Sequence, residues 1–169
     1  MKNRKAFVWM IIQLLIGTYG MAQKKPNVVI IISDDHAYQA IGAYGGFGHT
    51  PNIDRIAHGG IVFNRAYVNN SICGPARATL LTGKYSHKNG FKDNETSNFD
   101  FSQNSFVKEL QRVGYRTAWI GKIHLGHALQ GFDYYDILPG QGHYFNPDFI
   151  SSSGRSRAEG YVSDIVTDK

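Results

Sequence analysis

The sequence predicts an α/β fold with a largely parallel sheet, and three features indicate it. The stretch Asn27–Ser33 is a continuous β-branched run, which is typical of a strand covered on both faces. Strand-like and helix-like patterns then alternate along the chain. Reactive side chains follow the ends of expected strands, which is where parallel sheets bind their ligands.

The elements expected in the first half follow from local residue patterns. A glycine-rich loop, residues 42–48, comes after the first strand. Thr50 can cap a helix that begins at Pro51, because proline suits the opening turn of a helix. Gly59-Gly60 ends this helix, and Ile61–Tyr67 is a second expected strand.

The second half has a similar alternation of expected elements. A helix begins at Pro75 and stops at Gly83. The other expectations are, in order, an irregular polar stretch over 85–104, a short helix over Ser105–Arg112 with Phe106, Val107 and Leu110 inward, a third strand over Tyr115–Gly121, an extended loop over 125–153 and the start of a helix over Tyr161–Asp168.

Composition and the N-terminal residues suggest an exported globular protein. The cations Lys2, Arg4 and Lys5 precede an apolar stretch, Ala6–Ile16, that is short for a membrane span, and small residues then precede Gln23. We expect a signal peptide over residues 1–22 and a secreted or periplasmic location, with no stable membrane anchor. An uncleaved N-terminal anchor is the alternative.

Net charge and cysteine content exclude several classes of protein. Loss of the leader's three cations lowers the formal charge from +5 to +2, so basicity gives no reason to expect a nucleic-acid partner. The single cysteine, Cys73, excludes an internal disulfide and a cysteine-rich zinc site.

Cys73 has the surroundings of a reactive group. It lies at the expected start of a helix, where backbone amides favour anions, and Arg77 follows one turn later. A reactive side chain, a cation and amide donors would therefore converge. The alternative is a small buried hydrophobic residue, the usual fate of a free cysteine.

Two further clusters follow expected strands. Asp34 and Asp35 are adjacent carboxylates that repel each other unless a cation such as calcium or magnesium binds them, although aspartates also form turns. Lys122 and His124 are two residues apart, so on an extended segment they point to the same side and could bind an anion and move a proton. An exposed lysine beside an unrelated histidine is the alternative.

Three segments resemble the sulfatase family. The run Cys73–Lys84 resembles the signature in which a cysteine in a Cys-x-Pro-x-Arg context is oxidised to formylglycine, with Ala76 and Lys84 in place of the common serine and arginine. Gly114–Gly126 resembles the second sulfatase signature, with isoleucine where tryptophan is frequent. Pro26–Ser33 resembles the opening strand, which is followed by calcium-binding aspartates.

This resemblance, over Pro26–Lys169, implies an alkaline-phosphatase-like sandwich with a largely parallel central sheet, incomplete in this chain. It implies a sulfuric ester hydrolase whose catalytic residues are Cys73 (as formylglycine), Arg77, Lys122 and His124. Calcium, in preference to magnesium, would bind Asp34, Asp35 and residue 73. His36 and His143 are candidate substrate-binding residues, although a loop histidine such as His36 is more often structural or solvated.

The resemblance also implies partners and a substrate class. Residues 130–134 and 138–147 look like the N-acetylglucosamine-6-sulfatase and heparan-type group, which suggests a sulfated saccharide and glycosaminoglycan degradation. A formylglycine-generating enzyme or a radical sulfatase-maturating enzyme would act on Cys73.

Family members are longer and carry further metal ligands and a second lysine and histidine. We therefore expect residues 23–169 to be the N-terminal portion of a truncated catalytic domain, inactive alone; a complete, small protein is the alternative. The alternatives to a sulfatase function are a phosphodiester or phosphonate hydrolase of the same superfamily and a non-catalytic, secreted carbohydrate-binding remnant.

Overall fold

The structure is a computed structural model that describes residues 24–126 and 129–169. The expected signal peptide, residues 1–22, lies outside the described residues. The chain divides into two compact units, Met1–His36 and Ala37–Lys169, and each is described here by itself. Among the described residues, no helix has the length and apolar character needed to cross a membrane.

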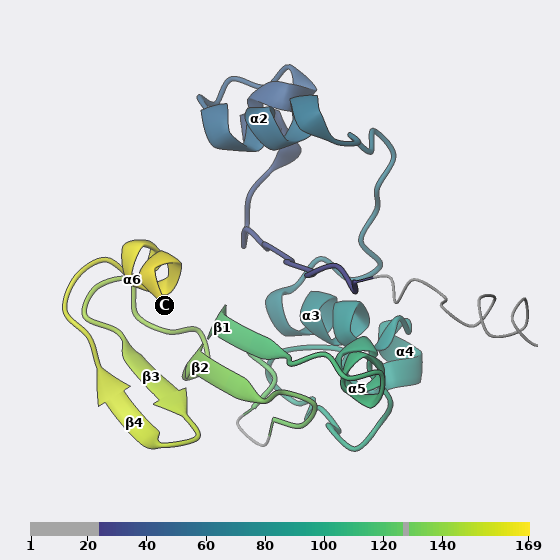
Figure 1. Ribbon diagram of the computed structural model, residues 1–169, viewed down its shortest axis with the longest axis vertical. Coiled ribbons are helices and arrows are strands. Elements are labelled where there is room, and N and C mark those ends of the chain that lie inside the picture. The colour runs from purple at the N-terminus through teal and green to yellow at the C-terminus, as the bar shows by residue number, and fades with distance from the viewer. Residues whose placement is uncertain (1–23, 127–128) are drawn as a thin grey trace, which may run out of the picture. The chain divides into compact units, whose positions relative to one another are not determined.

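The second unit contains one four-stranded sheet (Figure 1). Its strands, in spatial and chain order, are β1 (Ala118–Lys122), β2 (Tyr134–Leu138), β3 (Asp148–Ser151) and β4 (Gly154–Arg157). β1 and β2 are parallel and end together, with Lys122 opposite Leu138. The β2–β3 and β3–β4 pairs are antiparallel. The α/β class is confirmed, but the sheet of the described residues is mixed, with one parallel and two antiparallel pairs, where a largely parallel sheet was expected.

Helices precede and follow the strands along the chain. They are, in chain order, the 3-10 helices η1 (Tyr38–Ala40) and η2 (Gly42–Tyr44), then α2 (Pro51–Gly59), α3 (Cys73–Thr82), α4 (Ser86–Asn89), α5 (Phe106–Arg112) and α6 (Val162–Asp168). The helices expected from Pro51, over 105–112 and over 161–168 are confirmed. α3 begins at Cys73, two residues before the expected Pro75, and ends where Gly83 has a φ of 65°. The short helix α4 was not expected.

Two expected strands are wrong. Asn27–Ser33 and Ile61–Tyr67 have no strand conformation, and their apolar side chains are exposed; Val29 and Ile31 are 80% and 81% accessible. A buried strand requires neighbours for its amides and cover for its faces. No strand of the described residues pairs with either segment.

The extended loop expected over 125–153 is also wrong, because it contains β2 and β3. Each strand is only four or five residues long, and glycine-rich segments separate them. Such short runs give little periodicity, and their pairing depends on partners that are distant in sequence.

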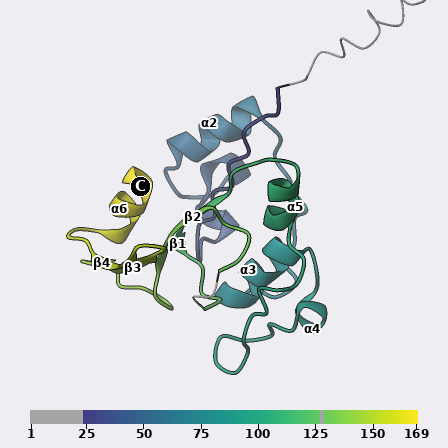
Figure 2. The ribbon, with the colours of Figure 1, turned by 60° about the horizontal axis from the view of Figure 1, so that its bottom comes forward.

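The hydrophobic core lies among α3, α5, the loop around residues 91–101 and the sheet. It consists of Ala78, Leu81, Phe91, Phe101, Val107, Ile123, Leu125 and Ile137. Figure 2 shows α3 beside α4 and α5, in agreement with their residue contacts. This packing supports the two segments, around Cys73 and Lys122, that carry the candidate site.

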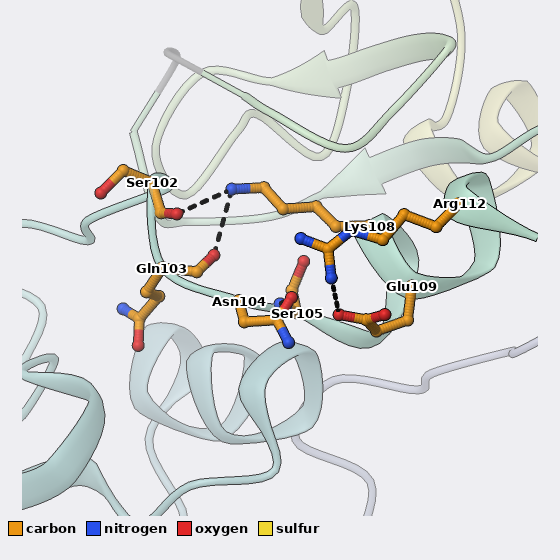
Figure 3. Close-up of polar contacts among 7 residues, drawn as sticks. All are labelled: Ser102, Gln103, Asn104, Ser105, Lys108, Glu109 and Arg112. Carbon is orange, nitrogen blue, oxygen red and sulfur yellow. Dashed lines mark hydrogen bonds and ion pairs between the residues drawn. The ribbon is translucent and has the colours of Figure 1, made fainter.

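Lys108 of α5 binds the loop at residues 102–103 (Figure 3), next to the core residue Phe101. Its ammonium donates to the backbone oxygens of Ser102 and Gln103, both at 3.1 Å, and to that of Phe101. It also donates to the side-chain oxygen of Gln130 at 3.3 Å. A lysine ammonium has three protons and no acceptor, so it suits a cluster of oxygens.

Candidate active site

Helix α3 places Cys73 at its first position, with the side chain partly exposed. The expected convergence of open amides is only partly present. The amide of Gly74 donates to the side-chain oxygen of Asn94 at 3.0 Å, and Pro75 has no amide proton. Asn94 therefore acts as a helix cap supplied by a distant segment.

Gly74 allows a close approach at the start of α3. A β-carbon at this position would lie 2.5 Å from the Phe91 ring, 2.7 Å from the Asn94 side-chain oxygen and 2.7 Å from the backbone oxygen of His124. Contacts this short are essentially absent between real side chains. A glycine after Cys73 therefore lets the helix start pack against the segment that follows β1.

Arg77 joins α3 to the end of β1. Its side chain is buried, and its Nη1 donates to the backbone oxygen of Cys73 at 3.0 Å. Its Nε donates to the backbone oxygen of Lys122 at 3.1 Å. The guanidinium turns back toward residue 73 as expected, but these two bonds are made to backbone carbonyls.

Lys122, the last residue of β1, reaches the same position. Its Nζ lies 3.2 Å from Cys73 Sγ and 2.6 Å from Gln141 Oε1. The backbone oxygen of Lys122 also accepts a bond from the Trp119 indole at 3.2 Å, which fixes the end of the strand. The structure therefore brings Cys73, Arg77 and Lys122 together.

His124 reaches the site by a different route from the one expected. β1 ends at Lys122, and His124 has a φ of 55°, so the same-side argument for an extended segment does not apply. A positive φ is uncommon for a residue with a β-carbon and marks a conformation held by its surroundings. The backbone oxygen of His124 lies beside Gly74, and its side chain is partly buried.

The remaining predicted site residues are Asp34, Asp35, His36 and His143. Asp34 and Asp35 form an exposed turn in the first unit, as the turn alternative expected, with a φ of 49° at Asp35. His36 follows them and shares a hydrogen bond of 3.0 Å with Ser33. His143 is exposed, two residues after Gln141. In residues 24–126 and 129–169, no three His, Cys, Asp or Glu side chains form a group that could hold a metal.

Comparison with known proteins decides the family. The family model for sulfatases matches residues 26–168, which is most of the chain. The chain belongs to the sulfatase family.

Two curated relatives support this assignment. This sulfatase-family chain is 49% identical over 150 residues to N-acetylglucosamine-6-O-sulfatase from Bacteroides thetaiotaomicron, a match that covers 86% of the chain and 27% of the relative. It is 36% identical over 126 residues to arylsulfatase G from Rattus norvegicus, with 68% of the chain and 24% of the relative covered. The chain thus spans about a quarter of the length of these relatives.

Solved structures confirm the expected fold. The structure of BT4656 in complex with its substrate D-glucosamine-2-N,6-O-disulfate matches with a TM-score of 0.83 and 48% identity, over 86% of this chain and 30% of that one. The structure of Ps i-CgsB matches with a TM-score of 0.77 and 30% identity, over 84% and 39% of the two chains. The alkaline-phosphatase-like fold of the sulfatases is therefore confirmed, and this chain covers part of that domain.

Two contacts of this sulfatase site were not anticipated. Asn94 holds the amide next to Cys73, and Gln141 holds the ammonium of Lys122. Asn94 stands 20 residues after Gly74, and Gln141 stands 19 residues after Lys122. No local periodicity marks either residue, and only the glycines on both sides of Gln141 indicate an unusual turn there.

Proposed function

We propose that the protein is a sulfuric ester hydrolase that removes 6-O-sulfate from glucosamine in a sulfated carbohydrate, with formylglycine at position 73. The observation that carries this proposal is the contact of Lys122 with Cys73 at 3.2 Å, beside the buried guanidinium of Arg77, in a chain of the sulfatase family. The names of the similar N-acetylglucosamine-6-O-sulfatase and of the glucosamine disulfate complex support the choice of sugar.

The two cations suit a reaction in which negative charge develops on a sulfate group. Preorganised donors stabilise such charge most when they are fixed before the substrate arrives. Arg77 is fixed by two backbone carbonyls, and Lys122 is fixed by Gln141. His124 would take up and return a proton at the hydroxyl groups of residue 73, a role that suits an imidazole near neutral pH. His36 and His143 are proposed to contact the sugar.

Formylglycine would supply, in its hydrated form, one hydroxyl that attacks sulfur and a second that allows the aldehyde to re-form. Position 73 fits this modification because its side chain is partly exposed at a helix start with a cation beside it. A formylglycine-generating enzyme or a radical sulfatase-maturating enzyme would carry out the oxidation.

A calcium ion is proposed at Asp34, Asp35 and residue 73. The chemistry of Asp34 and Asp35 suits a hard cation, since two adjacent exposed carboxylates supply oxygen ligands and relieve their mutual repulsion by sharing a positive charge. Residue 73 joins them in this proposal from the family resemblance alone. Calcium takes roughly six to eight oxygens, so these residues would supply only part of its coordination. A bound divalent cation would polarise the sulfate oxygens.

The expected signal peptide leads us to propose export to the periplasm or the medium, where sulfated glycosaminoglycan fragments would be the substrate. If Cys73 were not yet oxidised to formylglycine, its lone thiol would then lie in an oxidising compartment.

The decisive experiment is to produce the full-length protein together with a maturation enzyme and to measure the mass of the peptide that contains Cys73. An aldehyde at residue 73, with sulfate released from glucosamine 6-sulfate, supports the proposal. An unmodified thiol without sulfate release contradicts it and favours a carbohydrate-binding role. Faster turnover of a phosphate diester than of a sulfate ester would instead indicate a phosphodiesterase. Cys73→Ala is the control for both measurements.

A further inference from the structure

Gln141 lies beside Lys122 because two parallel strands end together. Lys122 and Leu138 are the last register pair of β1 and β2. A tight turn follows Leu138, in which the amide of Gly142 donates to the backbone oxygen of Pro139 at 3.0 Å. Gln141 is therefore presented beside the end of the neighbouring strand, where the Lys122 side chain begins.

The turn has a backbone that fixes the position of Gln141. Gly140 and Gly142, on either side of it, have φ values of 56° and 77°, which residues with a β-carbon rarely adopt. A β-carbon on Gly142 would also lie 2.8 Å from the Leu138 side chain. This packing against the end of β2 leaves the turn little freedom.

The side chain of Gln141 makes the shorter of the two contacts described for the Lys122 ammonium. Gln141 Oε1 accepts from Nζ at 2.6 Å, and Cys73 Sγ lies 3.2 Å from the same nitrogen. The four-carbon stem of a lysine is flexible, so its charge acts at a defined place only when something holds it. The two contacts hold the ammonium between the turn and residue 73.

The choice of an amide has an electrostatic consequence. A carboxylate at position 141 would hold Lys122 equally well, but it would cancel the positive charge and repel a sulfate group. The amide oxygen holds the ammonium and leaves the net charge of the pair at +1. The backbone carbonyls that fix Arg77 act in the same way.

We propose that Gln141 is a positioning residue that holds the Lys122 ammonium against residue 73 without neutralising it. This inference rests on the proposed function, because it assigns Gln141 a part in sulfate-ester hydrolysis through Lys122. Gln141 acts on the geometry of Lys122, and its removal lowers turnover more than substrate binding.

Kinetics of the matured, full-length protein test this role. Gln141→Leu removes the acceptor and lowers kcat about tenfold or more, with little change in KM. Gln141→Glu keeps an acceptor oxygen but cancels the charge of Lys122, so it also lowers kcat and in addition raises KM for the anionic ester. In a Lys122→Met background, Gln141→Leu lowers kcat by no more than about twofold, since coupled residues are non-additive. The same loss in both backgrounds, or an unchanged kcat in Gln141→Leu, overturns the proposal.

A second measurement does not depend on turnover. Labelling of lysine amines, followed residue by residue by mass spectrometry, becomes faster at Lys122 in Gln141→Leu. Gln130→Leu is the matched control, because Gln130 is an exposed glutamine that accepts a bond from another lysine, Lys108. It changes labelling at Lys108 and leaves both Lys122 labelling and kcat unaltered.

The two measurements separate the two proposals. If the wild-type protein hydrolyses no sulfate ester while Lys122 labelling still changes in Gln141→Leu, the proposed function fails and the contact stands. If wild-type turnover is present and Lys122 labelling is the same in both proteins, the positioning role of Gln141 is overturned.

Discussion

Gly74 is the residue of the site that leaves no room for a side chain. Gly74→Ala places a β-carbon within 2.7 Å of the Asn94 side-chain oxygen and the His124 backbone oxygen. We expect a loss of about 1–3 kcal/mol in the free energy of unfolding, the usual range for an overpacked position. Urea denaturation followed by circular dichroism measures it.

Gly59→Ala is the matched control for this prediction. Gly59 is also helical, at the end of α2, and a β-carbon there meets no atom within 4 Å. The change is therefore expected to leave stability unaltered or to raise it by about 0.4–1 kcal/mol. Equal losses in the two variants would contradict the packing argument for Gly74.

Asn94 supports the site through the Gly74 amide. Asn94→Ala leaves that amide without its acceptor and is expected to lower the free energy of unfolding by about 1 kcal/mol. Asn94→Asp keeps an acceptor oxygen, so stability should stay near the wild-type value. Its added charge near residue 73 should raise KM for a sulfate ester. Denaturation and initial-rate kinetics check the two variants, and equal instability in both would rule out the capping role.

The loop at residues 101–103 is held against helix α5 by a single cation, Lys108. Lys108→Met removes the bonds that Lys108 donates to the backbone oxygens of Ser102 and Gln103, drawn in Figure 3, and to that of Phe101. The loss leaves the partly buried carbonyls of Phe101 and Gln103 without their donor, so we expect about 1–3 kcal/mol of destabilisation. Thermal or urea unfolding provides the measurement.

Arg112→Ala is the comparison on the same helix. Arg112 pairs with Glu109 at the surface, and both side chains are about half or more exposed. Exposed ion pairs of this kind contribute roughly 0–1 kcal/mol. A larger loss in Arg112→Ala than in Lys108→Met would show that the loop does not depend on its carbonyl contacts.

The elements that the sequence predicted well are those with local signals. Pro51 and the pair Gly59-Gly60 frame α2, and Gly83 ends α3 in a left-handed conformation. The strands show the opposite behaviour. Asn27–Ser33 has a strong β pattern and is not a strand, because a strand exists only with a partner, and the partner is not encoded nearby.

The residues of the candidate site also fall into a group that local motifs predict and a group that they do not. Cys73, Arg77 and Lys122 belong to two signature motifs, so their convergence could be predicted from the chain alone. Asn94 and Gln141 could not be, since each arrives through tertiary structure: a loop that reaches the start of α3, and a turn set by the register of β1 and β2. A motif names the reacting groups, whereas the fold supplies the groups that hold them.

At the scale of the whole molecule, hydrogen bonds lower the pKa of four carboxyl groups among the described residues. The backbone amide of Thr96 is the main cause that lowers the pKa of Asp93 to about 2, assisted by the Thr96 hydroxyl. Asp93 thereby closes the turn that carries Asn94. Three more carboxyls have lowered pKa values, chiefly through side-chain hydrogen bonds: Asp100 from Ser102, Glu109 from Asn104, and Asp133 from Gln111.

These shifts predict how stability depends on pH. The folded pKa of Asp93 is about 2, below the ordinary value of 3.8, so between these values the folded chain binds fewer protons than the unfolded chain. The stabilisation is therefore fully present above about pH 4 and is lost as the pH falls toward about 2. Urea midpoints measured from pH 2 to pH 6 should fall with acidification. Asp93→Asn should make this fall shallower, whereas Glu95→Gln should not, because Glu95 joins the turn through its backbone amide. Identical slopes in wild type and Asp93→Asn would show that the Asp93 turn does not couple protonation to folding.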